Sequence, residues 1–466
     1  MKDIDLVKLA KLKKDYIKDS KNYILQNALS TSSIEKVIST RRLREFDVKM
    51  MFSHEVKTHG ITNQKASGRC WMFAGCNILR EEVIRKLKLK NFELSQSYLA
   101  FYDKIEKFNN DVRVLIDLVE NQYEEKGEFK YTDYEFSDHI TQVSQDGGNW
   151  GIFVNLVNKY GVVPKEIFPE SITSSATRVM NNLLSSLVKQ TVYAYITARK
   201  AQGKDIKEQF EGEIEKANAK AFKVIALNYG VPDDKFEYYF EIKDDKKDDD
   251  KDDDDSDALV PKTFKHFKGT PLEFYDKFIG KDFLNEFVRV TTYPKEGLDF
   301  NKMYTDRYSF GMYGKKELYL NVSYDDMEKL CIAQIKDNKP IWFCCDCLQN
   351  RDGTAIWDDK SYDYKSAFGV DLYFDKGPAM DLAHVEINHA MVLCGVNLNK
   401  KDVPDRWKIE NSWGKDAGDN GYYVASESWM QKCMGDAAIN IKYLSEEQKE
   451  MLKLEPIVVD GHTAAD

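Results

Sequence analysis

The spacing of apolar residues changes along this 466-residue chain, and that change restricts the fold that the chain can adopt. Up to about residue 285, apolar residues mostly recur every three or four positions, as they do in amphipathic helices. From about residue 286 they form short runs typical of β-strands, for example over residues 287–292, 340–345 and 389–397. Because the helices come first and the strands later, without regular alternation, we predict an α+β fold with a helical half and a β-rich half.

The expected helices are bounded by turn and capping residues. Residues 4–50 are predicted to form two amphipathic helical segments, separated near residues 27–33. After residue 94, Ser95 is expected to cap one helix, residues 111–123 to form another, and residues 153–160 a third that ends at Gly161. Two long helices are expected between residues 175 and 230, and a helix with proline in its first turn after Thr270.

The helix predicted to follow the Ser67-Gly68 turn carries a candidate nucleophile. Apolar residues recur at helical spacing from residue 71 to residue 87, and charged residues occupy the other side. Cys70 therefore falls in the first turn, where unpaired backbone N–H groups and the positive end of the helix dipole favour a thiolate and lower the thiol pKa. Gln64 lies six residues upstream, where its amide is suited to holding an oxyanion.

A nucleophilic cysteine needs an imidazole to take its proton and a third group to orient that imidazole. Of seven histidines, His389 is the best candidate, because it begins an apolar strand. Asn411 ends a later strand, and its side-chain carbonyl can accept the imidazole N–H without taking up charge. Trp413 is placed to cover that hydrogen bond from water, and it is also expected to contact the substrate. His54 and His59 remain alternative bases, since they lie near the cysteine in sequence.

Three separated segments resemble the papain-like cysteine peptidases, and more narrowly the bleomycin hydrolase and aminopeptidase C family. They are residues 63–74 (Asn-Gln-Lys-Ala-Ser-Gly-Arg-Cys-Trp-Met-Phe-Ala), 388–391 (Asn-His-Ala-Met) and 410–414 (Glu-Asn-Ser-Trp-Gly). Residues 146–151, 159–165, 168–171 and 270–275 also match, so the resemblance covers most of the chain. As in the cytosolic branch, the run Ser-Gly-Arg-Cys lacks the extra cysteine of secreted relatives, and 319 residues separate the cysteine from the histidine.

The resemblance implies a role for each candidate. Cys70 is the nucleophile, His389 the base and acid, Asn411 the residue that orients the imidazole, and Gln64 an oxyanion donor together with the Cys70 backbone N–H. The implied chemistry is peptide-bond hydrolysis through a thioester, with no metal and no organic cofactor. The implied fold has two subdomains, one helical and one resembling a β-barrel.

The resemblance also divides the chain and implies its assembly. In the family, the insertion and the N-terminal arm build a barrel-shaped hexamer with active sites that face an inner cavity, so a homohexamer is expected. The expected divisions are an N-terminal arm (1–60), a helical catalytic subdomain with Cys70 (61–174), a helical insertion (175–285) with an acidic loop (244–258), a β-rich catalytic subdomain with His389 and Asn411 (286–445), and a C-terminal arm (446–466).

Substrate contacts are expected at a glycine-rich loop and at the chain end. The family places substrate backbone against the loop that contains Gly147 and Gly148, where the absence of side chains permits close approach. Its chain end lies in the cleft and holds the free amine of the substrate through the terminal carboxylate, here that of Asp466, which implies an aminopeptidase. The Trp-Asp-Pro-Met-Gly element usual near the family's end is absent. An endopeptidase or oligopeptidase with a more open cleft is therefore the alternative.

Composition and charge exclude other classes of protein. The net charge is −10, of which residues 244–257 contribute −7, so no basic face for nucleic acid is expected. The N-terminus has no apolar signal segment, and no apolar run is long enough to span a membrane. A cytoplasmic enzyme acting on peptides is expected. The competing hypothesis is a catalytically silent assembly protein or nucleic-acid-binding protein that keeps the fold.

The eight cysteines suit a reducing compartment. Cys344, Cys345 and Cys347 raise the possibility of a zinc site, but adjacent strand cysteines fit tetrahedral coordination poorly, so buried thiols are expected instead. Cys76 and Cys394 lie on apolar faces and are expected in the core.

Overall fold

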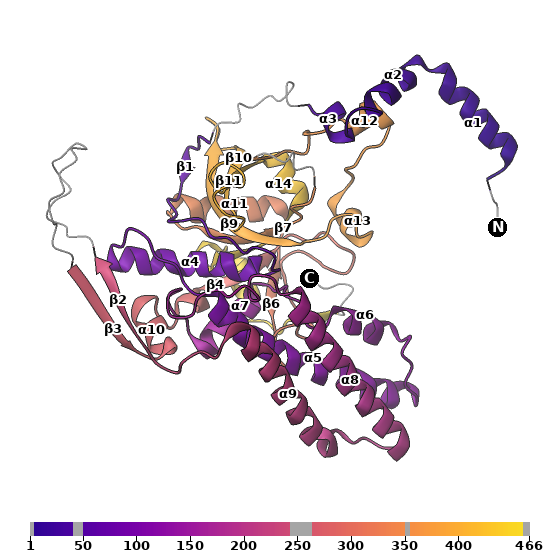
Figure 1. Ribbon diagram of the computed structural model, residues 1–466. Helices are drawn as coiled ribbons and strands as arrows, with labels where there is room; N and C mark the ends of the chain where they lie inside the picture. The colour runs from indigo at the N-terminus through magenta and orange to yellow at the C-terminus, as the bar shows by residue number, and fades with distance from the viewer. Residues whose placement is uncertain (1–3, 41–49, 243–262, 350–354, 460–466) are drawn as a thin grey trace.

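The computed structural model describes residues 4–40, 50–242, 263–349 and 355–459. Helix α4 (Cys70–Leu87) lies between a large curved sheet and the helices of the first half (Figure 1). One continuous cluster of buried apolar side chains spans both halves. The helices of the first half and the strands of the last third give the α+β arrangement that the spacing of apolar residues predicts.

The helical half is built on one long helix, α5 (Gln96–Lys126). It begins at Ser95, whose hydroxyl accepts the Tyr98 N–H at 3.0 Å, and ends at Gly127 with a left-handed φ of 72°. The sequence predicts two helices here, with a separate one over 111–123, whereas the structure has a single helix of 31 residues. The other helices that accompany α4 and α5 in this half are α6 (Tyr134–Gln142) and α7 (Trp150–Tyr160).

Among the described residues, the main sheet has eleven strands in the order β13-β5-β6-β4-β12-β7-β9-β10-β11-β8, with β1 paired to β9. Most neighbours are antiparallel, and the pairs β4–β6, β5–β13 and β8–β11 are parallel. The strands are β1 (His54–Glu55), β4 (Phe287–Thr291), β5 (Lys302–Asp306), β6 (Leu318–Asn321), β7 (Ile341–Cys345), β8 (Ile356–Trp357), β9 (His389–Leu398), β10 (Pro404–Glu410), β11 (Tyr422–Ser426), β12 (Met434–Asn440) and β13 (Ile457–Val459).

Short helices accompany the β-rich half. They are α11 (Tyr324–Lys336), α12 (Tyr364–Phe368), α13 (Lys376–Asp381), α14 (Glu427–Cys433) and α15 (Glu446–Met451).

The region predicted as a helical insertion contains both helices and strands. Helices α8 (Arg178–Gln202) and α9 (Lys207–Tyr229) pack on α5, as Figure 1 shows. A hairpin of β2 (Phe236–Ile242) and β3 (Thr263–Gly269) follows, which the sequence does not predict. Helix α10 (Pro271–Phe278) then begins with proline behind a Thr270 capping box, as predicted. The acidic loop 244–258 lies outside the described residues.

The N-terminal arm differs from the predicted pair of helical segments. Three helices are present: α1 (Leu6–Lys18), α2 (Ser20–Leu29) and α3 (Ile34–Ile38). The first predicted segment is interrupted at Asp19, because its carboxylate accepts the Lys21 N–H at 3.0 Å and starts a new helix. Helices α1 and α2 extend away from the body and bury no residue (Figure 1). None of the helices in the described part of the chain is long and apolar enough to cross a bilayer.

Candidate active site

A cleft of about 370 Å³ lies where the start of α4, the loop before α7 and the start of β9 meet. Cys70, Gln64, Gly147, Gly148 and His389 all line it, although they come from segments up to 325 residues apart. The structure thus brings five of the sequence-predicted site residues to one cavity. The remaining lining residues are Gly68, Trp71, Lys107, Asp111, Gln142, Ser144, Gln145, Asn149, Ile152, Arg289, Phe310, Cys344, Ile387, Asn388, Ala390 and Asp436.

Cys70 is the first residue of α4, as predicted, but its electrostatic setting differs from the prediction. The expectation was a thiol pKa lowered by the helix N-terminus. Burial instead raises the pKa of Cys70 above its usual value, although the backbone N–H groups of Ala390 and Trp71 at the sulfur oppose this effect. Removing an anion from water therefore outweighs the helix terminus. A thiolate at Cys70 needs a further positive charge beside it.

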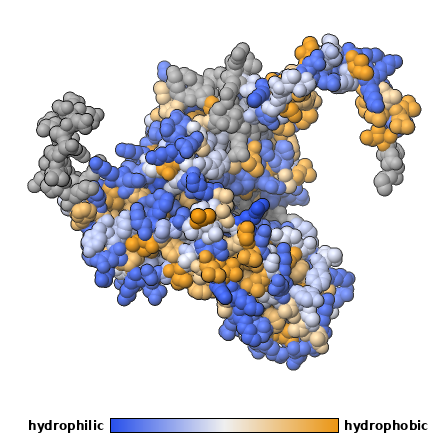
Figure 2. Space-filling view, in the orientation of Figure 1, coloured by the Kyte–Doolittle hydropathy of each residue, from blue (hydrophilic) through white to orange (hydrophobic). Residues whose placement is uncertain are grey.

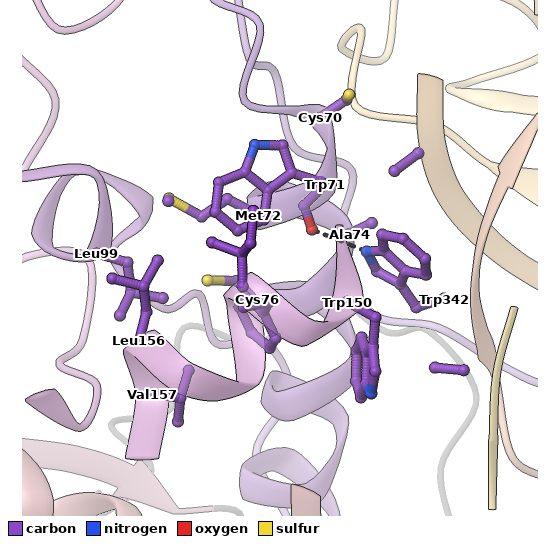
Figure 3. Close-up of a cluster of buried hydrophobic side chains, with 14 of the residues drawn as sticks. Cys70, Trp71, Met72, Ala74, Cys76, Leu99, Trp150, Leu156, Val157 and Trp342 are labelled. Carbon is purple, nitrogen blue, oxygen red and sulfur yellow. Dashed lines mark hydrogen bonds between the residues drawn. The ribbon is translucent and has the colours of Figure 1, made fainter. Parts of the chain in front are cut away.

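The start of α4 is fixed by the core beneath it. The Trp342 indole of β7 donates a hydrogen bond to the Trp71 backbone carbonyl at 2.9 Å. Figure 3 shows Cys70 at the edge of this apolar cluster, whereas Cys76, six residues later on the same helix, lies inside it. Cys76 and Cys394 are both buried, as predicted. The nucleophile candidate is thus held at the boundary between core and cleft.

The hydrogen bonds of Asn411 determine the tautomer of His389. The Ser412 backbone N–H, which can only donate, lies 2.7 Å from the Asn411 side-chain oxygen. The same oxygen lies 2.8 Å from His389 Nε2, so Nε2 must carry a proton. In the neutral ring the lone pair is then on Nδ1, which is therefore the atom able to accept a proton.

Trp413 covers the imidazole. Its indole is stacked on the His389 ring, with centroids 4.8 Å apart and planes inclined by 25°. Trp413 itself is not among the residues that line the cleft. Trp413 therefore covers one face of the imidazole, and its expected contact with the substrate stays a prediction.

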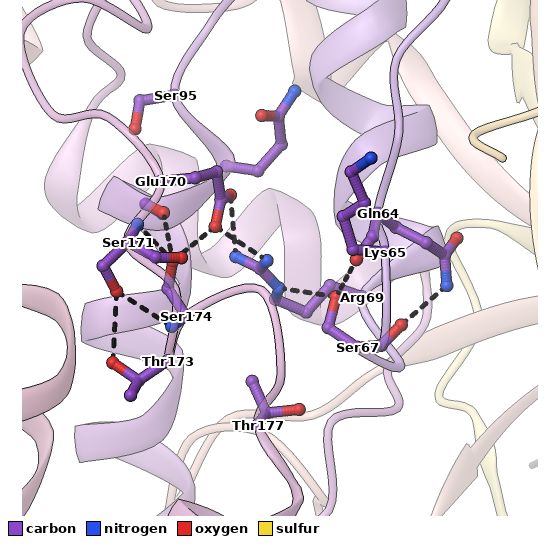
Figure 4. Close-up of polar contacts among 12 residues, drawn as sticks. Gln64, Lys65, Ser67, Arg69, Ser95, Glu170, Ser171, Thr173, Ser174 and Thr177 are labelled. Carbon is purple, nitrogen blue, oxygen red and sulfur yellow. Dashed lines mark hydrogen bonds and ion pairs between the residues drawn. The ribbon is translucent and has the colours of Figure 1, made fainter. Parts of the chain in front are cut away.

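Gln64 is held in the loop that leads to α4. The Ser67 carbonyl, which only accepts, lies 2.7 Å from Gln64 Nε2, and the Ser412 hydroxyl donates to Gln64 Oε1 at 2.7 Å. These two contacts fix the amide orientation and leave the second Nε2 hydrogen available. The loop is braced from behind by Arg69, which donates to the Ser67 hydroxyl and pairs with Glu170 at 3.0 Å (Figure 4).

A buried ion pair joins the two halves next to the site. Arg80 of α4 and Glu410 of β10 approach to 2.7 Å and are almost completely excluded from solvent. Asn77, also of α4, donates to the same carboxylate at 2.8 Å. Because Glu410 directly precedes Asn411, this contact fixes the strand end that holds the imidazole relative to the helix that carries Cys70.

The two glycines of the loop before α7 have different surroundings. A side chain at Gly148 would place its Cβ 2.6 Å from the Trp71 indole, so only glycine fits against that ring. A Cβ at Gly147 would meet nothing within 4 Å. Gly148 therefore has a packing role in addition to lining the cleft, whereas Gly147 borders open space.

The alternative sites lie elsewhere or outside the described residues. His54 is on β1 next to Ser53, and His59 pairs with Glu81 at 2.7 Å; neither lines the cleft. The proposed chain-end contact, Asp466, falls outside the described residues. Within them, no group of three or more histidine, cysteine or acidic residues is arranged to hold a metal ion, and Cys344, Cys345 and Cys347 are buried free thiols.

Several charged residues of the cleft were not identified from the sequence. Lys107 and Asp111 of α5 line it, as do Arg289 of β4 and Asp436 of β12, which pair at 2.7 Å. The only sequence signal for the α5 pair is that charged residues interrupt an otherwise apolar helix face. Arg289 and Asp436 are 147 positions apart in the sequence, so their ion pair leaves no local sequence pattern that could predict it.

Comparisons with known proteins cover nearly the whole chain. A family model described as Peptidase C1-like family matches residues 3–463. Aminopeptidase C of Lactococcus lactis subsp. cremoris is 33% identical over 454 residues, which is 96% of each chain. Bleomycin hydrolase of Homo sapiens is 30% identical over 419 residues, covering 88% of this chain and 86% of that protein. The crystal structure of PepW from Lactobacillus rhamnosis HN001 matches with a TM-score of 0.88 at 28% identity, covering 98% of this chain and 97% of that one.

Proposed function

We propose a catalytic mechanism and a substrate class for this chain, which belongs to the Peptidase C1-like family and has the papain-like cysteine peptidase fold. It is a cysteine peptidase of the branch that includes aminopeptidase C and bleomycin hydrolase. The predicted family and fold class are therefore confirmed. The roles of individual residues, the peptide end that is cleaved, and the assembly are proposals argued from the site.

In the proposed mechanism, His389 takes the proton of Cys70 through Nδ1. Since burial raises the pKa of the isolated thiol, the imidazolium formed on this transfer supplies the positive charge that stabilises the thiolate. Asn411 accepts the Nε2–H throughout and keeps the ring in the orientation required. The observation that carries the proposal is the hydrogen bonding of the Asn411 side-chain oxygen, which faces both the Ser412 backbone N–H and Nε2 of His389. The His389 ring lines the same cleft as Cys70.

The thiolate then attacks the carbonyl carbon of the scissile peptide bond. The developing oxyanion is stabilised by the remaining Gln64 Nε2–H and by the Cys70 backbone N–H at the start of α4. His389 gives its proton to the leaving amine as the C–N bond breaks, which leaves a thioester on Cys70. Water, deprotonated by His389, hydrolyses the thioester and regenerates the thiol.

We propose that the enzyme releases residues from the free amino end of peptides. The names of the relatives, aminopeptidase C and bleomycin hydrolase, support this choice. We propose further that the terminal carboxylate at Asp466 binds the substrate amine and that the backbone at Gly147 and Gly148 contacts the substrate. The test is mass spectrometry of products from one peptide with a free and one with an acetylated N-terminus. Stepwise loss from the free peptide alone is expected, whereas internal cuts in both would favour an endopeptidase.

We also propose that the chain works as a homohexamer in the cytoplasm. The supporting observation is the arm: Leu6, Val7 and Ile17 of α1 and Tyr23 and Ile24 of α2 are exposed, and Figure 2 shows apolar side chains along this extension. A second copy of the chain is the proposed cover for these side chains. Light scattering of the full chain is expected to give six times the mass of one chain, and removal of residues 1–30 to lower it; a full-length monomer contradicts this assembly.

A further inference from the structure

Helix α5 carries four ionisable side chains inside the protein. Asp103, Lys104, Lys107 and Asp111 are each at most 5% exposed. Asp103, Lys107 and Asp111 recur every four residues and Lys104 lies three before Lys107, so all four lie on neighbouring turns of one side of the helix. Buried charges are strongly unfavourable unless they are paired and hydrogen-bonded. What these side chains contact therefore indicates what they do.

Three of them hold consecutive residues of the glycine-rich loop. Asp111 accepts the Ser144 backbone N–H at 2.7 Å, and Lys104 donates to the Gln145 carbonyl at 3.0 Å. Lys104 also pairs with the Asp146 carboxylate at 2.6 Å. Lys107 donates to the Gly147 carbonyl.

The same loop is connected to the residues around the nucleophile. The Trp71 indole, next to Cys70, donates to the Asp146 carbonyl at 2.8 Å, and the Gly68 N–H donates to the Asp146 carboxylate at 3.2 Å. The Lys107 ammonium lies 5.0 Å from the centre of the Trp71 ring. Lys107 thus contacts both the loop and the residue that follows the nucleophile, and it lines the cleft.

The direction of the Lys107 contact determines which edge of a peptide group faces the cleft. In a trans peptide the carbonyl of one residue and the N–H of the next point in opposite directions. With the Gly147 carbonyl directed at Lys107, the Gly148 N–H must point away from it. No group among the described residues accepts that N–H, and Gly148 lines the cleft.

We propose that Lys107 is a positioning residue for substrate binding, which orients the Gly147–Gly148 peptide so that the Gly148 N–H is presented to a backbone carbonyl of the peptide substrate. This inference rests on the proposed function and assigns a role to a residue outside the catalytic set. Lys107 also donates to Asp103 at 3.1 Å, so the cation is held between a carboxylate and the loop. Its removal is expected to free the Gly147–Gly148 peptide to rotate while Cys70 and His389 keep their own contacts.

The test compares Lys107→Met with wild type in the full chain. Methionine keeps the length of the side chain but removes the charge and the hydrogen bonds. Because the substitution leaves Asp103 without its nearest cation, the double variant Asp103→Asn/Lys107→Met removes one charge of each sign and keeps the net buried charge of wild type. Both are expected to raise KM for a free-amine peptide about 10- to 100-fold, the effect of one charge-assisted hydrogen bond, with kcat within about threefold. The rate of Cys70 alkylation by iodoacetamide, which needs no loop contact, is expected to stay within about twofold.

Glu120→Gln is the matched control. Glu120 is also buried on α5 and pairs with Arg199 at 2.8 Å, but it faces α8 and does not line the cleft. Its KM is expected to equal that of wild type. The inference is overturned if KM is unchanged in both Lys107 variants, or if Glu120→Gln raises KM as much as they do. In either case, wild-type turnover of the peptide leaves the proposed function standing. A wild-type protein without peptidase turnover overturns both.

Discussion

The Arg80–Glu410 ion pair offers a quantitative test of how the two halves are held together. Both side chains are almost fully buried, their charged atoms lie 2.7 Å apart, and Asn77 is the other α4 residue that contacts this carboxylate. We consider Arg80→Met, which keeps most of the packing volume and removes the charge. The substitution leaves the Glu410 carboxylate in the core with a single neutral donor from α4.

The expected loss follows from the burial of that carboxylate. Breaking a fully buried ion pair by removing one partner costs about 3–5 kcal/mol, because the other charge remains without compensation. Burial already raises the pKa of Glu410 above its usual value of 4.5, and Arg80 opposes that rise. Without Arg80 the folded-state pKa rises further. A carboxyl group with a raised folded pKa favours folding below its unfolded pKa, and this stability is lost as pH increases through the folded pKa.

Arg80→Met is therefore expected to approach wild-type stability below about pH 4.5 and to lose most stability above pH 7. Urea unfolding at several pH values, followed by tryptophan fluorescence, measures this loss. Arg80→Met/Glu410→Gln is expected to recover much of it, and Arg85→Met on the exposed side of α4 to change stability by less than about 0.5 kcal/mol. A loss that is equal at pH 4 and pH 8, or no loss at all, refutes the reasoning.

Three further predictions concern the cleft. Gln64→Ala is expected to lower kcat by about 10²–10³-fold, while the rate of Cys70 alkylation stays unchanged. A decrease in kcat of less than about fivefold in steady-state assays argues against an oxyanion role for Gln64. Gly148→Ala is expected to lower the free energy of unfolding in urea by about 1–3 kcal/mol, because the added Cβ would meet the Trp71 indole at 2.6 Å. Gly147→Ala has room for its Cβ and is expected to keep wild-type stability, and equal stabilities of the two variants contradict this reasoning. Burial raises the Asp111 pKa to about 7, so stability is lost as pH rises from 4 through 7. Asp111→Asn should remove that pH dependence from melting temperatures, and an unchanged profile opposes the assignment.

The sequence predicts the parts of the site that depend on local patterns. The turn before residue 69 and the periodicity after it correctly predict where the helix with Cys70 begins, and the strand that starts at His389 follows from an uninterrupted apolar run. Gln64 follows from its place on the loop that leads into this helix, and the family resemblance supports the same residue. These segments are defined by residues that are close in sequence.

Other features depend on contacts between distant residues. Helix α5 is one helix rather than two because polar residues on its inner face, including Lys104 and Lys107, find partners in a loop about 40 positions away. Strands β2 and β3 pair across the acidic segment, so neither shows a short-range hairpin signal. The raised pKa of Cys70 likewise follows from its burial in the folded protein, which the sequence around the helix terminus does not reveal.

The most direct test of the mechanism is the pH dependence of Cys70 alkylation in wild type and in His389→Ala. Burial alone raises the thiol pKa, so a reactive sulfur at low pH requires the imidazolium of His389. We expect wild-type Cys70 to react with iodoacetamide already near pH 5–6, and the His389→Ala protein to react only in alkaline solution. Identical profiles for the two proteins, both rising only above pH 9, would contradict an activated Cys70–His389 pair.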